Sequence, residues 1–472
     1  MKSNFKDTAA NLYLKLFPLA PLAILAGVAQ YHFRSFLPLQ RLFMGLQFFD
    51  FITVTDLFVG LIVALFVIGV LMRSLTLQKR ALPWEWKAAI GFLLLSAFFQ
   101  LGFQNVLEPV LSTPFEYFRS LFIFPLLLTT MGFLTLDKKA VSGLMRSYLW
   151  MVGAFCVLAL AQYFGEFFPG ESKDFMGRLV WPFIDFVTLK SSSANWAAFF
   201  VMPAVTLSFV SAFSALRQRK GTFVSRQASP RGQAHSASLR AWQIASQQSP
   251  LPLAKGLYVL LFILSSTTLY LTQSYGGYAA VLVAITLYLF RALPFKKFLL
   301  SLLVIFAVIG AGYLHQQTTW KYQVLTGEIS YRFANSAASR GDIYRMNLAM
   351  ILKNPLLGVG MNQYQNYFAA NQKEVLGYEL NESHVPPHAH NFFLSFWTSL
   401  GFFGFLAMII LVLGLFWRTK FDPLNPVVFV IVAIMIHGLI DSWYWKQDTA
   451  YTFWLMIMFA YLYKLPATGL LK

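Results

Sequence analysis

The chain has 472 residues, of which 57% are hydrophobic and only 12% are charged. Its mean hydropathy of +0.59 excludes an ordinary soluble globular domain and predicts a protein of the lipid bilayer. The formal net charge of +18 does not indicate nucleic-acid binding, because the basic residues lie between apolar runs and not on one folded surface.

Long, continuous apolar runs predict transmembrane helices and not the short alternating strands of a membrane barrel. The predicted fold class is therefore an all-α polytopic membrane protein with about 12 transmembrane helices. In chain order we expect them at 12–31, 57–75, 88–105, 118–135, 147–165, 193–214, 256–272, 276–291, 297–313, 391–416, 427–441 and 450–465. The first has no evident cleavage site and is expected to remain as an anchor. The lone Cys156 lies within an apolar run and is expected to be buried.

The loops between these helices predict the orientation of the chain. Basic loops face the cytoplasm, and with both termini inside every loop rich in Lys and Arg does so. These loops are 73–80, 138–146, 217–255, 291–297 and 418–420. The opposite loops, including the long segment 314–389, are then predicted to lie outside the cytoplasm.

The pattern divides the chain into five parts. Residues 1–214 hold the first six predicted helices, 256–313 the next three and 390–472 the last three. Residues 215–255 are rich in Ser, Gln and basic residues and lack acids, which predicts a disordered cytoplasmic linker near anionic lipid. Residues 314–389 mix both charge signs with aromatic residues, and we expect a helical periplasmic subdomain there.

The residues suited to chemistry gather on the predicted outer side. Histidine can accept a proton from a sugar hydroxyl near neutral pH, and arginine makes bidentate bonds to phosphate. The candidates are Arg178, Arg332, Arg340, Arg345, His388, His390 and His437. His437 and Asp441 are four residues apart and are expected on one helix face, where ionisable groups often line a cavity. Gly358 and Gly360 are expected to be turn residues.

Two motifs resemble the O-antigen ligase and polymerase superfamily. One is Pro387-His388-Ala389-His390-Asn391-Phe392-Phe393-Leu394, at the entry to a predicted span. The other begins with Arg340 and Tyr344 and continues to the turn Asn354-Pro355-Leu356-Leu357-Gly358-Val359-Gly360. The resemblance covers about residues 272–405.

The resemblance implies a GT-C-like inverting glycosyltransferase of the bacterial inner membrane, with its active site facing the periplasm and with no metal or other cofactor. Its partners would be an undecaprenyl-diphosphate-linked glycan donor, a lipid A–core acceptor and membrane lipids. His390 would be catalytic and Arg340 would bind the diphosphate, while His388 and His437 would serve the acceptor or support the site. The family usually has an arginine where this chain has Tyr275, so Arg345, Arg332 or Arg178 would supply a second diphosphate contact.

Other functions remain open at this point. An O-antigen or exopolysaccharide polymerase, or a protein O-oligosaccharyltransferase, would use the same donor and differ only in its acceptor. A lipid-glycan transporter would need cationic residues along its spans. The predicted spans of this chain are nearly uncharged, which disfavours a transporter. His384, His388 and His390, with Glu379 and Glu382 nearby, also have the residue types of a zinc site. The Pro386-Pro387 pair disfavours that alternative, because it prevents a helix from presenting the ligands together.

Overall fold

The computed structural model describes residues 2–24, 54–78, 82–100, 118–166, 173, 178–180, 194–227, 255–326, 336–380, 385–442, 444–445 and 447–463. Within these ranges the only β structure is one isolated bridge, between Lys173 and Leu179. The predicted all-α fold class is therefore confirmed for the described part of the chain.

The helices follow the apolar runs. They are α1 (Lys2–Leu16), η1 (Phe17–Leu19), α4 (Val54–Leu71), α5 (Trp84–Phe99), η5 (Arg119–Ile123), α7 (Phe124–Thr135), α8 (Lys138–Gly165), α9 (Ala194–Gln227), α11 (Lys255–Leu271), α12 (Tyr275–Ala292), α13 (Phe295–Gln316), α14 (Trp320–Thr326), α15 (Ser336–Lys353), α16 (Tyr364–Leu376), α17 (Phe392–Thr419), α18 (Pro426–Gly438) and α19 (Gln447–Tyr463). Five helices in the described part are long and apolar enough to cross a membrane, lying in α8, α9, α12, α13 and α17, and six shorter apolar helices accompany them. These features are those of a helical membrane protein.

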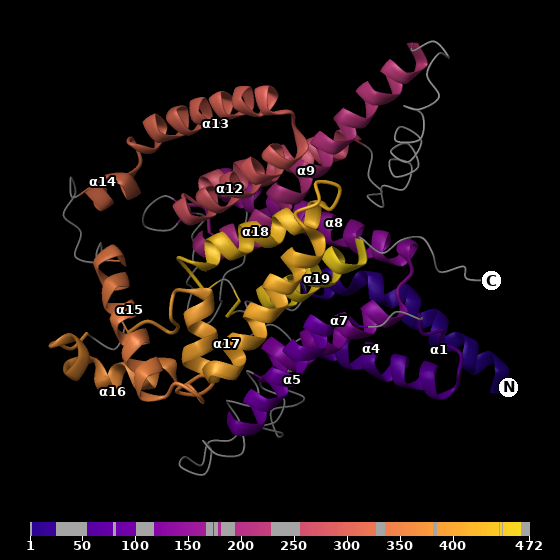
Figure 1. Cartoon of the computed structure of the whole chain (residues 1–472), viewed down its shortest axis with the longest axis horizontal. Helices are drawn as coiled ribbons and strands as arrows, with labels where there is room; N and C mark the ends of the chain where they lie inside the picture. The colour runs from indigo at the N-terminus through magenta and orange to yellow at the C-terminus, as the bar shows by residue number, and fades with distance from the viewer. Residues whose placement is uncertain are drawn as a thin grey trace.

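The centre of the protein is a bundle around α18 and α19. Helix α18 packs against α9, α12 and α19, while α9 packs along α11 and α17 packs along α5. In Figure 1, α18 and α19 (yellow) lie between α9 and α12 above and α17 and α5 below. Nearly every residue of α18 is buried, which explains why its sequence is apolar on all sides.

The segment from α13 to α16 is built differently. Helix α13 stands apart from the bundle in Figure 1, and Gln316 is its one buried residue although the helix is strongly apolar. Its exposed side chains suit contact with lipid. Helices α15 and α16 have a small hydrophobic core of their own, which consists of Ile343, Met346, Met350, Tyr364, Phe368, Leu376, Val385 and Ala389.

The turn at residues 354–360 has a packing role. Gly358 and Gly360 have φ angles of +71° and +105°, so the prediction that they are turn residues is confirmed. The turn rests on a kink of α17 at Gly401, and the Val359 N–H donates to the Thr398 carbonyl at 2.7 Å. A Cβ on Gly358 would lie 2.5 Å from that carbonyl oxygen, so only glycine fits at this close approach. The turn thereby fixes α15 and α16 to the first half of α17.

Two boundaries differ from the sequence prediction. Helix α9 continues to Gln227, so the first residues of the predicted disordered linker 215–255 are helical, and residues 228–254 lie outside the described ranges. A polar composition does not stop a helix that is already nucleated by an apolar span. Helix α18 ends at Gly438, not at 441, and Asp441 lies in the turn that follows. The Asp441 N–H still donates to the His437 carbonyl at 3.1 Å, so the two residues lie one turn apart across the end of α18.

Candidate active site

His390 lies where the chain enters α17, in the non-helical segment 385–391. The next residue, Asn391, caps the helix, because its side chain accepts a hydrogen bond from the Leu394 N–H at 3.0 Å. His390 itself has φ +46°, in the left-handed region that costs a non-glycine residue about 1–3 kcal/mol. Such strain persists only where neighbouring contacts fix the backbone.

Those contacts come from both sides of the segment. The Asn391 N–H donates to Ser442 Oγ at 3.1 Å, and the Asn391 side-chain amide donates to the Leu439 carbonyl at 2.8 Å. From the other side, the buried Asn347 of α15 donates to the Ala389 carbonyl at 2.9 Å. The histidine segment is thus held between α15 and the turn after α18.

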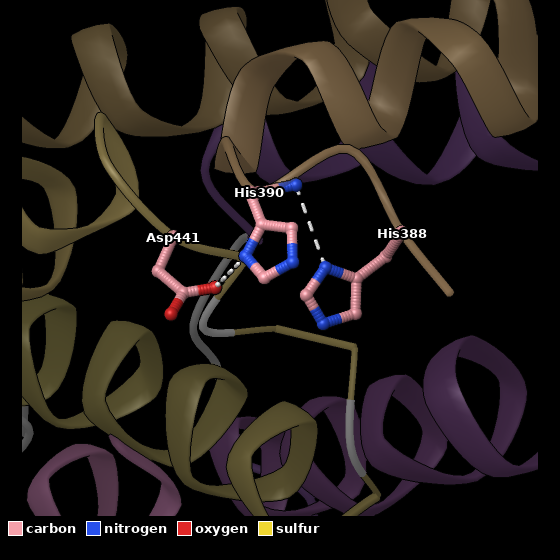
Figure 2. Close-up of side chains that lie close together, drawn as sticks. All are labelled: His388, His390 and Asp441. Atoms are coloured by element: carbon pink, nitrogen blue, oxygen red, sulfur yellow. Dashed lines mark hydrogen bonds and ion pairs between the residues drawn. The ribbon is translucent and has the colours of Figure 1, made fainter. Parts of the chain in front are cut away.

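This arrangement brings His390 to Asp441, 51 residues further along the chain. Figure 2 shows the pair, in which His390 Nδ1 lies 3.0 Å from Asp441 Oδ1. The Asp441 side chain is 5% exposed and the His390 side chain 27% exposed. The carboxylate is therefore held inside, while the imidazole still reaches the surface.

The Asp441 carboxylate determines which imidazole nitrogen can act as a base. Burial alone would raise the pKa of Asp441, but the hydrogen bond and charge of His390, with the nearby His388 and His437, hold that pKa below its ordinary value. An ionised carboxylate only accepts hydrogen bonds, so His390 Nδ1 must donate. The lone pair then lies on Nε2, which is the arrangement required of a general base.

His388 lies beside His390. The two ring centroids are 4.4 Å apart, and His388 Nδ1 accepts a hydrogen bond from the His390 backbone N–H at 3.4 Å. In Figure 2 the His390 ring lies between His388 and Asp441. Each of these three side chains offers one possible ligand atom, and the three atoms lie within 4.8 Å of one another. Among the described residues, this is the group that could hold a metal ion.

His437 is a buried neighbour of Asp441. It is 2% exposed and packs edge-on against Phe199, with ring centroids 4.6 Å apart. Its Nε2 would be 3.1 Å from a Cβ on Gly276, so glycine at the start of α12 leaves room for the imidazole. Its burial separates it from solvent and disfavours its protonated form, which Asp441 favours and Arg340 disfavours.

Arg340 and Arg345 lie on different faces of α15. Tyr344, one turn after Arg340, donates to the Leu439 carbonyl in the turn that carries Asp441, and Arg340 interacts electrostatically with His437. Arg345 is exposed and donates to the Val375 carbonyl of α16 at 3.3 Å. Arg340 thus lies within electrostatic range of His437, while Arg345 contacts α16. Arg332 lies outside the described residues.

Two further cationic side chains interact with Tyr275, the first residue of α12. Lys321 Nζ of α14 lies 4.2 Å from the centroid of the Tyr275 ring, a cation–π contact, and donates to the Gln273 carbonyl. Arg178 interacts electrostatically with Tyr275, and the next residue, Leu179, donates its N–H to the Leu271 carbonyl at 2.8 Å. Gly276, beside Tyr275, adjoins His437, which connects this cationic group to the His390 group.

Sequence reasoning missed Asn347 and Lys321 and singled out Asp441 only as a neighbour of His437. No spacing rule links Asp441 to His390 across 51 positions. Lys321 stands in a short helix of mixed composition, and only the contact with Tyr275 distinguishes it from other surface lysines. A lone acid beyond the end of an apolar helix was the one available signal for Asp441.

The fold and the site together define a class: a helical membrane protein with a histidine that is hydrogen-bonded to a buried carboxylate at the entry to a long apolar helix. Residues 260–409, 150 of the 472 residues, match the family model described as O-antigen ligase, which supports the resemblance to that superfamily. Members of that family are membrane enzymes of the glycosyltransferase type. The matched range includes Arg340, Lys321, His388 and His390, while Asp441 lies beyond it. No curated protein matches the chain.

Proposed function

We propose that the protein is an O-antigen ligase: an inverting glycosyltransferase that transfers an undecaprenyl-diphosphate-linked glycan to the lipid A–core acceptor. The observation that carries this proposal is the His390–Asp441 pair at the entry to α17, with a donor–acceptor distance of 3.0 Å. Arg340 of α15 is close enough to interact electrostatically with the neighbouring His437. The family match supports the donor class, since ligases and polymerases of this superfamily act on lipid-linked glycans.

In this reaction His390 Nε2 removes the proton from an acceptor hydroxyl as that oxygen attacks the anomeric carbon of the donor sugar. A bond forms between the acceptor oxygen and the anomeric carbon, and the bond from that carbon to the diphosphate oxygen breaks. Asp441 stabilises the imidazolium that forms, in the way a buried carboxylate supports a catalytic histidine. Arg340, with Lys321 and Arg178, offsets the charge on the leaving diphosphate without a metal or other cofactor.

We further propose that the site faces the periplasm of the bacterial inner membrane. Arg418 at the far end of α17 pairs with the buried Glu85 at 3.1 Å, so the start of α5 and the end of α17 lie on one side. Helix α17 runs from His390 to that side through its kink at Gly401, and the part after the kink, residues 402–419, alone spans about 27 Å at the rise of an α-helix. The basic residues around 418–420 favour the cytoplasm for their side, which leaves His390 on the other.

Alkaline phosphatase fusions test this orientation. The reporter is expected to be inactive after residue 235 and active after residue 325. The reverse pattern would exclude a periplasmic site.

The function itself is tested in a deletion strain by lipopolysaccharide gel electrophoresis. Loss of a ligase leaves bare lipid A–core, with polymer retained on its lipid carrier. Core that carries a single repeat would instead identify a polymerase, and unchanged lipopolysaccharide with loss of a protein-linked glycan would identify a protein O-oligosaccharyltransferase. Complementation with the wild-type chain and with His390→Ala then connects the phenotype to the site.

A further inference from the structure

The three side chains at the centre of the site also have the chemistry of a metal chelator. His388 and His390 offer imidazole nitrogens and Asp441 offers a carboxylate oxygen, and their ligand atoms lie within 4.8 Å of one another. Two nitrogens and one oxygen are a ligand set that zinc favours, whereas Mg²⁺ and Ca²⁺ favour oxygen ligands alone. The ligand set therefore favours a divalent cation of the zinc class over Mg²⁺ or Ca²⁺.

The distances are close to those that such an ion requires. Bonds of 2.0–2.1 Å in a tetrahedron separate neighbouring ligand atoms by about 3.3 Å. His390 Nδ1 and Asp441 Oδ1 are already 3.0 Å apart. His388 must come closer than the 4.8 Å within which the three ligand atoms lie, and it stands half-buried on a non-helical segment after Pro386-Pro387.

We propose that His388, His390 and Asp441 form a binding site for a zinc-class divalent cation, and that occupation of this site inhibits transfer. The inhibition rests on the proposed function, because a His390 that coordinates the ion through Nδ1 carries its proton on Nε2 and cannot accept another one there. Binding takes the place of the proton on His390 Nδ1, which moves to Nε2, so the coordinated imidazole stays neutral. The periplasmic side would expose the site to external zinc.

The binding test needs no turnover. Purified full-length protein in lipid nanodiscs is titrated with Zn²⁺ by calorimetry and with Co²⁺ by visible absorption, where tetrahedral cobalt gives an intense band. We expect one ion per chain, and His388→Gln should weaken binding by at least about tenfold. The matched control is His315→Gln, because His315 bonds to Tyr270 away from the three residues. Equal affinity of the wild type and His388→Gln would overturn the proposed site.

The activity test uses the same preparations with a lipid-linked donor and acceptor. Zn²⁺ should inhibit the wild type, a chelator should restore transfer, and Mg²⁺ at the same concentration should have no effect. Zinc-dependent stimulation would overturn inhibition and make the ion a catalytic participant. If the wild type transfers no glycan under any condition, the proposed function fails, while the calorimetric and cobalt results still decide whether the site exists.

Discussion

The two sides of the site are constructed in different ways. The side with His390 and Asp441 is fixed by backbone contacts, since Asn391, Ser442 and Leu439 join the start of α17 to the turn after α18. The cationic side comes from separate elements, with Arg340 on α15 and Lys321 on α14. A base must present one particular nitrogen, whereas a diphosphate can be bound by cations from several directions. The fixed side should therefore control turnover and the cationic side should control use of the donor.

The largest effect is expected from the base itself. His390→Ala should lower kcat by roughly 10²- to 10⁴-fold while the protein folds normally, because it removes the imidazole that takes the acceptor proton. His388→Ala should lower it less, since His388 touches the backbone of His390 and not its Nδ1. Turnover of purified protein with donor and acceptor measures both. Near-normal turnover of His390→Ala would place the base elsewhere.

Asp441→Asn tests whether the fixed side works through the tautomer of His390. The amide keeps the shape of the carboxylate but can donate to Nδ1, which would move the proton to Nε2 and remove the base. We expect kcat to fall by about 10- to 10³-fold, with the KM for donor nearly unchanged. Asn195→Ala is the control, because Asn195 contacts the other carboxylate oxygen at 3.5 Å. A change confined to KM would contradict the assigned role of Asp441.

These two sides also differ in how far the sequence predicts them. The apolar runs predicted α12 and α13 within a few residues, because lipid requires a long apolar helix whatever its neighbours are. His390 and Arg340 were found through a resemblance in local motifs. The partner of His390 depends on how α17 meets the turn after α18, and Lys321 depends on how α14 meets α12. Such contacts between distant segments follow from packing, and local sequence patterns do not contain them.

Arg340 tests the cationic side. Arg340→Ala should lower kcat/KM for the lipid-linked donor by roughly 10- to 100-fold, the range of a lost charge-assisted hydrogen bond. Arg340→Lys should recover only part of this, because an ammonium does not match two phosphate oxygens at once. Arg345→Ala, on the other face of α15, is the matched control and should change kcat/KM little. Equal activity of Arg340→Lys and the wild type would mean that positive charge alone suffices.

The smallest effect is expected at Lys321. Lys321→Gln should raise the KM for donor by about threefold to tenfold with kcat nearly unchanged, because its half-buried ammonium lies over Tyr275 and acts as a single point charge. Lys373→Gln removes the same charge from α16, where Lys373 is 79% exposed and pairs with Glu379, and it should have no effect on KM. If both variants raise KM equally, the outer segment attracts the donor through its general positive charge. If Lys321→Gln lowers kcat instead, Lys321 belongs functionally to the fixed side, and the division between the two sides does not hold.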